Sequence, residues 1–93
     1  MTTRNAIRPE GPGTRGIFYV HSTPSALCPH IEWAVGGALG AAVSLDWTEQ
    51  PAQPGAYRAE LSWTGSAGTA AAIVSALRGW DRLRFEITEE PTT

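Results

Sequence analysis

Two alternating stretches, VSLDWT at residues 43–48 and YRAELSW at residues 57–63, decide the fold. In both stretches apolar side chains alternate with polar ones, which is the period of a strand that buries one face. The stretch between them, QPAQPG at residues 50–55, holds two prolines and a glycine and cannot continue a strand. We therefore expect the two stretches to form an antiparallel hairpin.

Two further strands are expected outside this hairpin. IFYVH at residues 17–21 is rich in β-branched and aromatic side chains, and LRFEIT at residues 83–88 alternates again. No apolar face precedes Gly16, so we expect residues 1–15 to be a flexible tail. Residues 16–90 are then expected to form one domain, followed by a short C-terminal end at residues 91–93.

A helix is expected over residues 29–39, because proline fits the first helical position and Pro29 stands there. Residues 25–28 would form the turn that leads into it. Gly36, Gly37 and Gly40 lower its helix propensity, and we interpret them as points of close packing on the sheet rather than as an early end near Gly36. Apolar residues at steps of three and four form its expected buried stripe: Ile31, Val35, Ala38, Leu39 and Ala42.

A second helix is expected after the break at residues 64–68, with Ser66 or Thr69 as its N-cap and Gly79 at its end. The expected buried face of this helix holds four residues: Ile73, Ala76, Leu77 and Trp80. Gly65 to Thr69 precede the helix and could hold an anion on backbone N–H groups, although turn chemistry explains the same residues.

The order strand, helix, strand, strand, helix, strand predicts an α+β fold. With right-handed crossovers it is the ferredoxin-like split βαβ arrangement, in which two helices cover one face of a four-stranded antiparallel sheet. The first and third strands would lie in the centre. A sheet that pairs edge to edge with a second copy remains the alternative architecture.

Composition narrows the classes of function. Among 93 residues no apolar run reaches the roughly 20 residues of a membrane span, and residues 1–15 lack the apolar stretch of a secretory signal. The only cysteine, Cys28, cannot form an internal disulfide, which favours a reducing cytoplasm. The net charge of −2 argues against nucleic-acid binding. We expect a cytoplasmic protein with no cofactor and with neither a nucleic-acid nor a membrane partner.

One face of the predicted sheet is left open. If Phe18 and Val20 point at the helices, then Ile17, Tyr19 and His21 emerge at the centre of the other face. An aromatic side chain on a central strand can stack a base, but the acidic balance disfavours that interpretation. The face is either solvated, with Arg–Glu pairs across strands, or covered by another chain or by missing sequence, and we favour a covered face. Its expected binding residues are Tyr19 and Arg58.

His21, Cys28 and His30 lie within ten residues, and the first crossover is expected to bring them near one another. Cys28 would sit at a helix N-terminus, where the dipole lowers a thiol pKa, so a nearby histidine could make it a nucleophile. Alternatively the three side chains could hold zinc, with Glu32 or water as the fourth ligand. No established motif has this spacing, and a buried structural cysteine is the interpretation we favour.

Arg78, Arg82 and Arg84 gather after the second helix, where positive charge suits the helix dipole and could meet an acidic protein partner. Because these arginines and the open sheet face could both contact another protein, we expect the chain to act through a protein partner or through self-association.

Residues 19–40, 46–52, 58–65 and 75–91 resemble an actinobacterial family, domain of unknown function 3145. The resemblance implies no activity and no catalytic residue. It implies that members continue beyond Glu90-Pro91, so that this chain is an N-terminal portion or a shortened member and the missing part covers the face around Tyr19. Family genes often lie beside genes of type II fatty-acid synthesis, which implies a link to that system and an acidic partner such as acyl carrier protein.

Three functions are therefore expected, in order. The first is a non-catalytic interaction or regulatory domain that docks a protein through its open sheet face. The second is a metal-binding or thiol-dependent enzyme centred on His21, Cys28 and His30. The third is a regulatory domain that binds a small ligand between the first helix and the hairpin loop.

Overall fold

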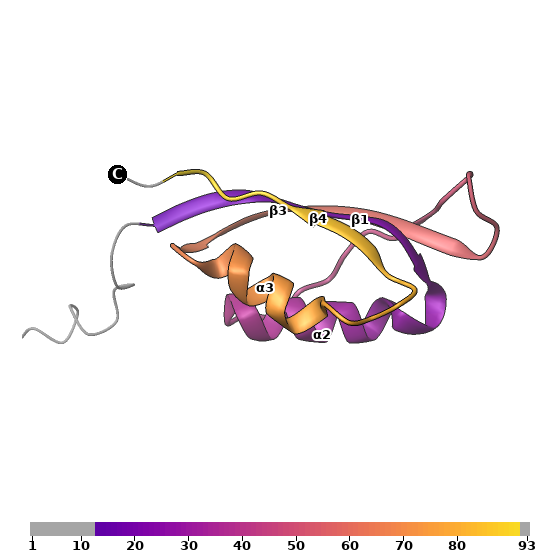
Figure 1. The fold of residues 1–93 in the computed structure, drawn as a ribbon, viewed down its shortest axis with the longest axis horizontal. Helices are drawn as coiled ribbons and strands as arrows, with labels where there is room; N and C mark the ends of the chain where they lie inside the picture. Colours follow the sequence, from indigo (N-terminus) through magenta and orange to yellow (C-terminus); the bar gives the residue numbers. More distant parts are fainter. Residues whose placement is uncertain (1–12, 92–93) are drawn as a thin grey trace, which may run out of the picture.

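The computed structural model of the chain describes residues 13–91. Its elements follow the order β1 (Gly13–Pro24), the 3-10 turn η1 (Ser25–Leu27), α2 (Cys28–Leu39), β2 (Thr48–Glu49), β3 (Ala56–Ser66), α3 (Thr69–Leu77) and β4 (Arg84–Ile87). The strands form one antiparallel sheet in the order β2-β3-β1-β4, with β1 and β3 central as expected. Both helices lie on the same side of this sheet (Figure 1). The predicted α+β fold is confirmed.

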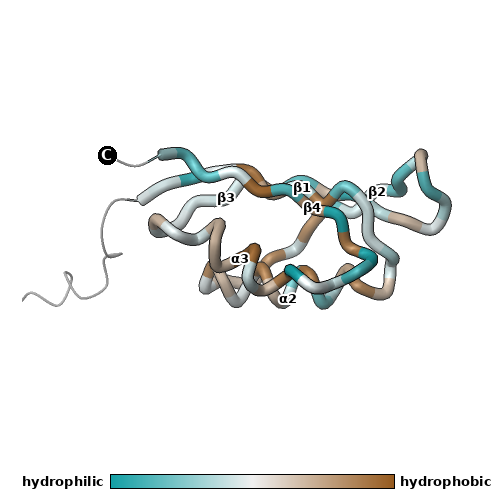
Figure 2. The backbone as a smooth tube through the Cα atoms, in the orientation of Figure 1, coloured by the Kyte–Doolittle hydropathy of each residue, from teal (hydrophilic) through white to brown (hydrophobic). Residues whose placement is uncertain are grey.

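The core lies between the sheet and the two helices. Phe18 and Val20 of β1 are buried, and they pair with Leu61 and Ala59 of β3, so this side of the pleat faces the helices. Hydrophobic segments lie in the middle of the sheet and in the helices, whereas the hairpin between β2 and β3 is mostly hydrophilic (Figure 2). The buried side chains include Ile31, Val35, Leu45, Trp63, Ile73, Leu77 and Leu83.

The strand β1 is longer than the sequence predicts. It begins at Gly13, so residues 13–15 belong to the sheet and not to a tail. These residues pair with β3 between Thr64 and Ser66, and β3 itself extends beyond the predicted end at Trp63. Pairing with β3 holds residues 13–15 in the sheet, although these residues bury no apolar face. The rest of the predicted tail, residues 1–12, lies outside the described residues.

The predicted strand at 43–48 is wrong for most of its length. Only Thr48 and Glu49 pair with β3. The backbone N–H of Leu45 instead donates a hydrogen bond to the Glu32 carboxylate of α2 at 2.8 Å, and the segment descends toward that helix. The alternation of burial persists, because Leu45 is buried while Ser44 and Asp46 are exposed. The sequence pattern therefore identified the inward side chains correctly, although most of this segment does not pair with β3.

Helix α2 runs through Gly36 and Gly37 to Leu39, as predicted, and Gly40 ends it with a left-handed φ of 76°. The predicted packing of its glycines on the sheet is wrong. A Cβ at Gly36 would meet the carbonyl oxygen of Ala41 at 2.9 Å, and a Cβ at Gly37 would meet nothing within 4 Å. Ala42 lies beyond the helix and is exposed, so it leaves the predicted stripe.

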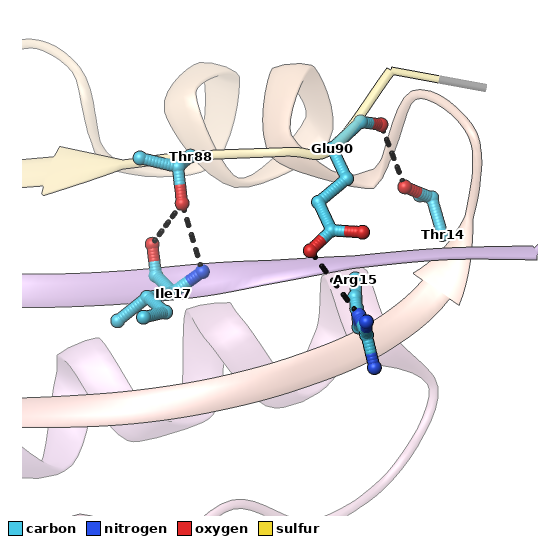
Figure 3. A network of polar contacts seen from close by, with 5 residues as sticks. All are labelled: Thr14, Arg15, Ile17, Thr88 and Glu90. Atoms are coloured by element: carbon cyan, nitrogen blue, oxygen red, sulfur yellow. Dashed lines mark hydrogen bonds and ion pairs between the residues drawn. The ribbon is translucent and has the colours of Figure 1, made fainter.

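The C-terminal segment continues along β1 beyond the last strand residue. The backbone N–H of Thr88 donates to the Ile17 carbonyl at 2.9 Å, and that of Glu90 donates to the Arg15 carbonyl at 2.8 Å. Side chains reinforce this pairing (Figure 3): the Thr88 hydroxyl accepts from the Ile17 N–H at 3.0 Å, and Arg15 forms an ion pair with Glu90. The end of the described chain is thereby fastened to β1.

Candidate functional site

Tyr19 lies at the centre of the sheet face that the helices leave open. It pairs with Glu60 of β3 on one side and with Glu86 of β4 on the other. Directly opposed residues of neighbouring strands share a side of the pleat, so both carboxylates flank the Tyr19 ring. The expectation that Phe18 and Val20 face the helices is confirmed by their burial.

His21 completes an aromatic pair on this face. Its imidazole is stacked on the Tyr19 ring, with 5.7 Å between centroids and an interplanar angle of 8°. The Nε2 atom lies 3.0 Å from Oε1 of Glu86, within hydrogen-bonding and ion-pairing distance. The stack and the carboxylate contact together fix the orientation of the ring. We name Tyr19, His21, Glu60 and Glu86 the aromatic centre of the open face.

A shallow hollow adjoins the aromatic centre toward β2. Arg58 lies in it, pairs with Thr48 across the ladder and is exposed. The two predicted binding residues of this face, Tyr19 and Arg58, therefore line one hollow. The remaining lining residues are Val20, His21, Asp46, Thr48, Gln50, Ala59 and Glu60.

The predicted cluster of His21, Cys28 and His30 is not assembled. His21 lies on the open face of the sheet, whereas Cys28 and His30 lie in the first turn of α2 beneath the opposite face. Within residues 13–91, no group of three or more histidine, cysteine, aspartate or glutamate side chains could hold a metal ion. The sheet itself separates the side chains that the crossover was expected to bring together.

The predicted lowering of the Cys28 pKa is also wrong. Cys28 is the first residue of α2, and Leu27 occupies the N-cap position. Partial burial raises the thiol pKa by desolvation, and the negative charge of Glu32 adds to this effect. The thiol donates weakly to the Pro24 carbonyl, with 3.9 Å between sulfur and oxygen. The environment of Cys28 therefore favours the unreactive thiol over the thiolate.

Two of the three predicted arginines come together. Arg82 and Arg84 line one hollow beside the tip of the β2–β3 hairpin, while Arg78 is the C-cap of α3 and does not line it. This hollow adjoins the hairpin loop, and its other walls come from the end of β1 and from the connection between α3 and β4.

Sequence reasoning missed the group that caps α3. Neither Ser66 nor Thr69 serves as the N-cap, which is Gly68 with a φ of 95°. The carboxylate of Glu89 accepts hydrogen bonds from the N–H groups of Gly68 and Ala70, each at 2.9 Å. The predicted anion cradle thus holds a carboxylate of the same chain. Gly68 supplies no side-chain acceptor at the N-cap, and the Glu89 carboxylate takes that role from a distant segment that no local pattern indicates.

Sequence reasoning also missed Trp33, which is 82% exposed on the outer face of α2. Ile31 and Val35 lie four residues apart and face the core, so position 33 between them lies on the other side of the helix. The exposure of Trp33 therefore follows from the helical period of about 3.6 residues. Trp33 borders an apolar surface formed with small residues that follow it: Ala34, Gly36, Gly37, Ala41, Ala42 and Val43.

The family model described as "Protein of unknown function (DUF3145)" matches residues 17–93. The chain belongs to this family. The match covers all of the described helices and the strands β2 to β4, together with most of β1. The description of DUF3145 carries no activity.

No curated protein and no solved structure matches the chain. Within residues 13–91, none of the helices is both long enough and apolar enough to cross a membrane.

Proposed function

We propose that this chain is a cytoplasmic, non-catalytic interaction domain that docks a partner protein through the open face of its sheet. The observation that carries the proposal is the aromatic centre. A tyrosine and a histidine are stacked on a central strand, and both helices lie on the opposite side of the sheet. Aromatic side chains of this kind supply contact area at low entropic cost in protein interfaces.

The charges around Tyr19 favour one chemistry of partner. Glu60 and Glu86 flank the ring, and Asp46 lines the adjoining hollow, so three carboxylates stand against the single positive charge of Arg58. These carboxylates repel phosphate groups, which speaks against a nucleic acid on this face. They suit a basic side chain of a partner protein, whose guanidinium stacks on the aromatic pair while it pairs with the carboxylates.

The enzymatic alternative receives no support from the same geometry. A nucleophilic thiol needs a base within hydrogen-bond reach. His21 lies across the sheet from Cys28, and His30 follows Cys28 by two positions in α2, a spacing at which helix side chains do not face each other. The raised pKa of Cys28 opposes thiolate formation as well. The position of these residues therefore supports the interaction domain over catalysis.

A capture experiment with matched variants tests the proposal. The tagged protein and its variants Tyr19→Ala and Trp33→Ala are used as bait in an extract of the native host, and captured proteins are identified by mass spectrometry. Each variant removes one aromatic ring: the half-exposed Tyr19 on the open face of the sheet, or the exposed Trp33 on the opposite side of the fold.

The proposal expects a stoichiometric partner with the wild type and Trp33→Ala, and its loss with Tyr19→Ala. Loss with Trp33→Ala and retention with Tyr19→Ala would overturn the assignment to the sheet face. Circular dichroism of each variant shows that the fold is kept.

A further inference from the structure

A second hollow lies at the end of the sheet, away from the aromatic centre. It is bounded by the hairpin tip on one side and by the connection from α3 to β4 on the other. We name it the polar hollow. Its lining residues are Ser22, Pro24, Gln53, Pro54, Gly55, Ala56, Asp81, Arg82 and Arg84.

The floor of the polar hollow is ordered by hydrogen bonds. Ser22 is only 8% exposed, and its hydroxyl donates to Oε1 of Gln53 at 3.1 Å. Because this bond uses the amide oxygen, the Nε2 hydrogens of Gln53 are left to donate elsewhere. The backbone N–H of Ala56 donates to the Gln53 carbonyl at 3.1 Å, which closes the turn beneath the side chain.

The charge of the polar hollow is positive. Arg82 and Arg84 contribute two guanidinium groups against the single carboxylate of Asp81. In the described part of the chain neither arginine lies within ion-pairing distance of an acidic side chain. Guanidinium groups present several N–H donors in a planar fork that matches phosphate oxygens. Two of them beside a free amide donor form a set that suits a compact anion.

We propose that the polar hollow binds a small molecule through its phosphate monoester group. Arg82 and Arg84 neutralise the phosphate, and Gln53, held by Ser22, donates to one of its oxygens. The cavity volume of about 180 Å³ lies below the roughly 300–1,000 Å³ of pockets that enclose a drug-sized ligand. The hollow therefore takes the phosphate while the rest of the ligand extends into solvent.

This site is independent of the open sheet face. Tyr19 and the carboxylates of the aromatic centre do not line the polar hollow. The phosphate site can therefore be tested without any partner protein, and its failure leaves the proposed function untouched.

Titration with inorganic phosphate, followed by amide NMR shifts, tests the proposal. Sodium chloride at equal ionic strength controls for salt effects, and acetate controls for a general preference for anions. The variants Arg82→Gln and Arg84→Gln each remove one charge from the hollow, and Arg78→Gln removes the same charge outside it. Thermal unfolding of every variant shows that the fold is kept.

We expect saturable shifts at Ser22, Gln53 and residues 81–84 with phosphate and not with chloride. Each variant within the hollow should weaken binding on the order of tenfold or more, because it removes charge-assisted hydrogen bonds. Arg78→Gln and Tyr19→Ala should bind like the wild type. Equal weakening by Arg78→Gln, acetate binding as tight as phosphate, or shifts no larger than those with chloride would each overturn the proposal.

Discussion

Glu89 accepts a hydrogen bond from the backbone N–H of Ala70 at 2.9 Å, and so closes the N-terminus of α3 with a carboxylate that comes from beyond β4. A negative charge at this end of a helix is favourable, because the unpaired N–H groups there carry partial positive charge. The contact joins two segments that are 19 residues apart in the chain. It fastens α3 to the C-terminal segment, which in turn pairs with β1.

Glu89 should make folding stability depend on acidic pH. Its two backbone hydrogen bonds lower the carboxyl pKa below the ordinary value of about 4.5. A group whose pKa is lower in the folded state stabilises the fold above its unfolded pKa, and that contribution disappears as the pH falls through the folded pKa. Glu89→Gln should therefore unfold at lower denaturant concentration than the wild type at pH 7, and the difference should shrink below pH 4.5.

Denaturant unfolding followed by tryptophan fluorescence across this pH range measures the effect. Glu90→Gln, which removes a neighbouring carboxylate that does not cap α3, serves as the control. A difference between Glu89→Gln and the wild type that is constant with pH would contradict the capping role.

Replacing two glycines by alanine should change the stability of the fold in opposite directions. A Cβ at Gly16 would overlap the carbonyl oxygen of Thr88 and approach Trp63 at 3.0 Å. Gly16→Ala should thus cost about 1–3 kcal/mol of stability, as overpacked sites do. At Gly37, inside α2, the new methyl group meets nothing within 4 Å, so Gly37→Ala should gain about 0.5–1 kcal/mol through helix propensity.

Chemical denaturation of the two variants measures both predicted changes in the free energy of unfolding, a loss for Gly16→Ala and a gain for Gly37→Ala. A neutral Gly16→Ala variant would show that β1 and the C-terminal segment do not approach as closely as the structure describes.

The Glu32 carboxylate should be an important link between α2 and the segment before β2. Its Oε2 atom accepts from the backbone N–H of Leu45 at 2.8 Å and from the indole Nε1 of Trp47 at 3.1 Å. Glu32→Ala leaves both donors without this acceptor and should cost about 1–3 kcal/mol. Glu32→Gln keeps an amide oxygen at the same position and should cost less. Denaturant unfolding of both variants measures the ranking, and equal losses would refute a hydrogen-bonding role for Oε2.

Cys28 should alkylate more slowly than free cysteine. Desolvation and the charge of Glu32 raise its pKa above the ordinary value of 9.0, so a smaller fraction is thiolate at pH 8. The rate of modification by iodoacetamide, followed by mass spectrometry, measures this fraction. A rate above that of free cysteine would revive the thiol-dependent enzyme as a function.

The sequence predicted the fold class because polar and apolar residues alternate along its strands. Trp63 of β3 was identified as inward because apolar side chains repeat at every second position of that strand. In β1 the successive apolar residues leave two choices, and the sequence places Phe18 inward only as a condition. Pro29 correctly indicated where α2 begins, because a proline at the first helical position acts locally.

The sequence did not predict contacts that depend on distant acceptors. The segment before β2 leaves the sheet because Glu32 takes the backbone N–H of Leu45, and no pattern within residues 43–48 signals that acceptor. The cap of α3 by Glu89 is likewise a contact between segments. The cluster of His21 with Cys28 failed because His21 shares the open face of the sheet with Tyr19, whereas Cys28 begins the helix that packs on the opposite face.

A chemical-shift footprint of the captured partner tests the central claim most directly. Unlabelled partner is added to isotope-labelled protein, and the shifted amides are assigned along the chain. The account predicts that the largest shifts fall at Tyr19, His21 and Glu60, while Trp33 and its surroundings on α2 stay unchanged. Shifts concentrated around Trp33, with the open face of the sheet unaffected, would contradict it.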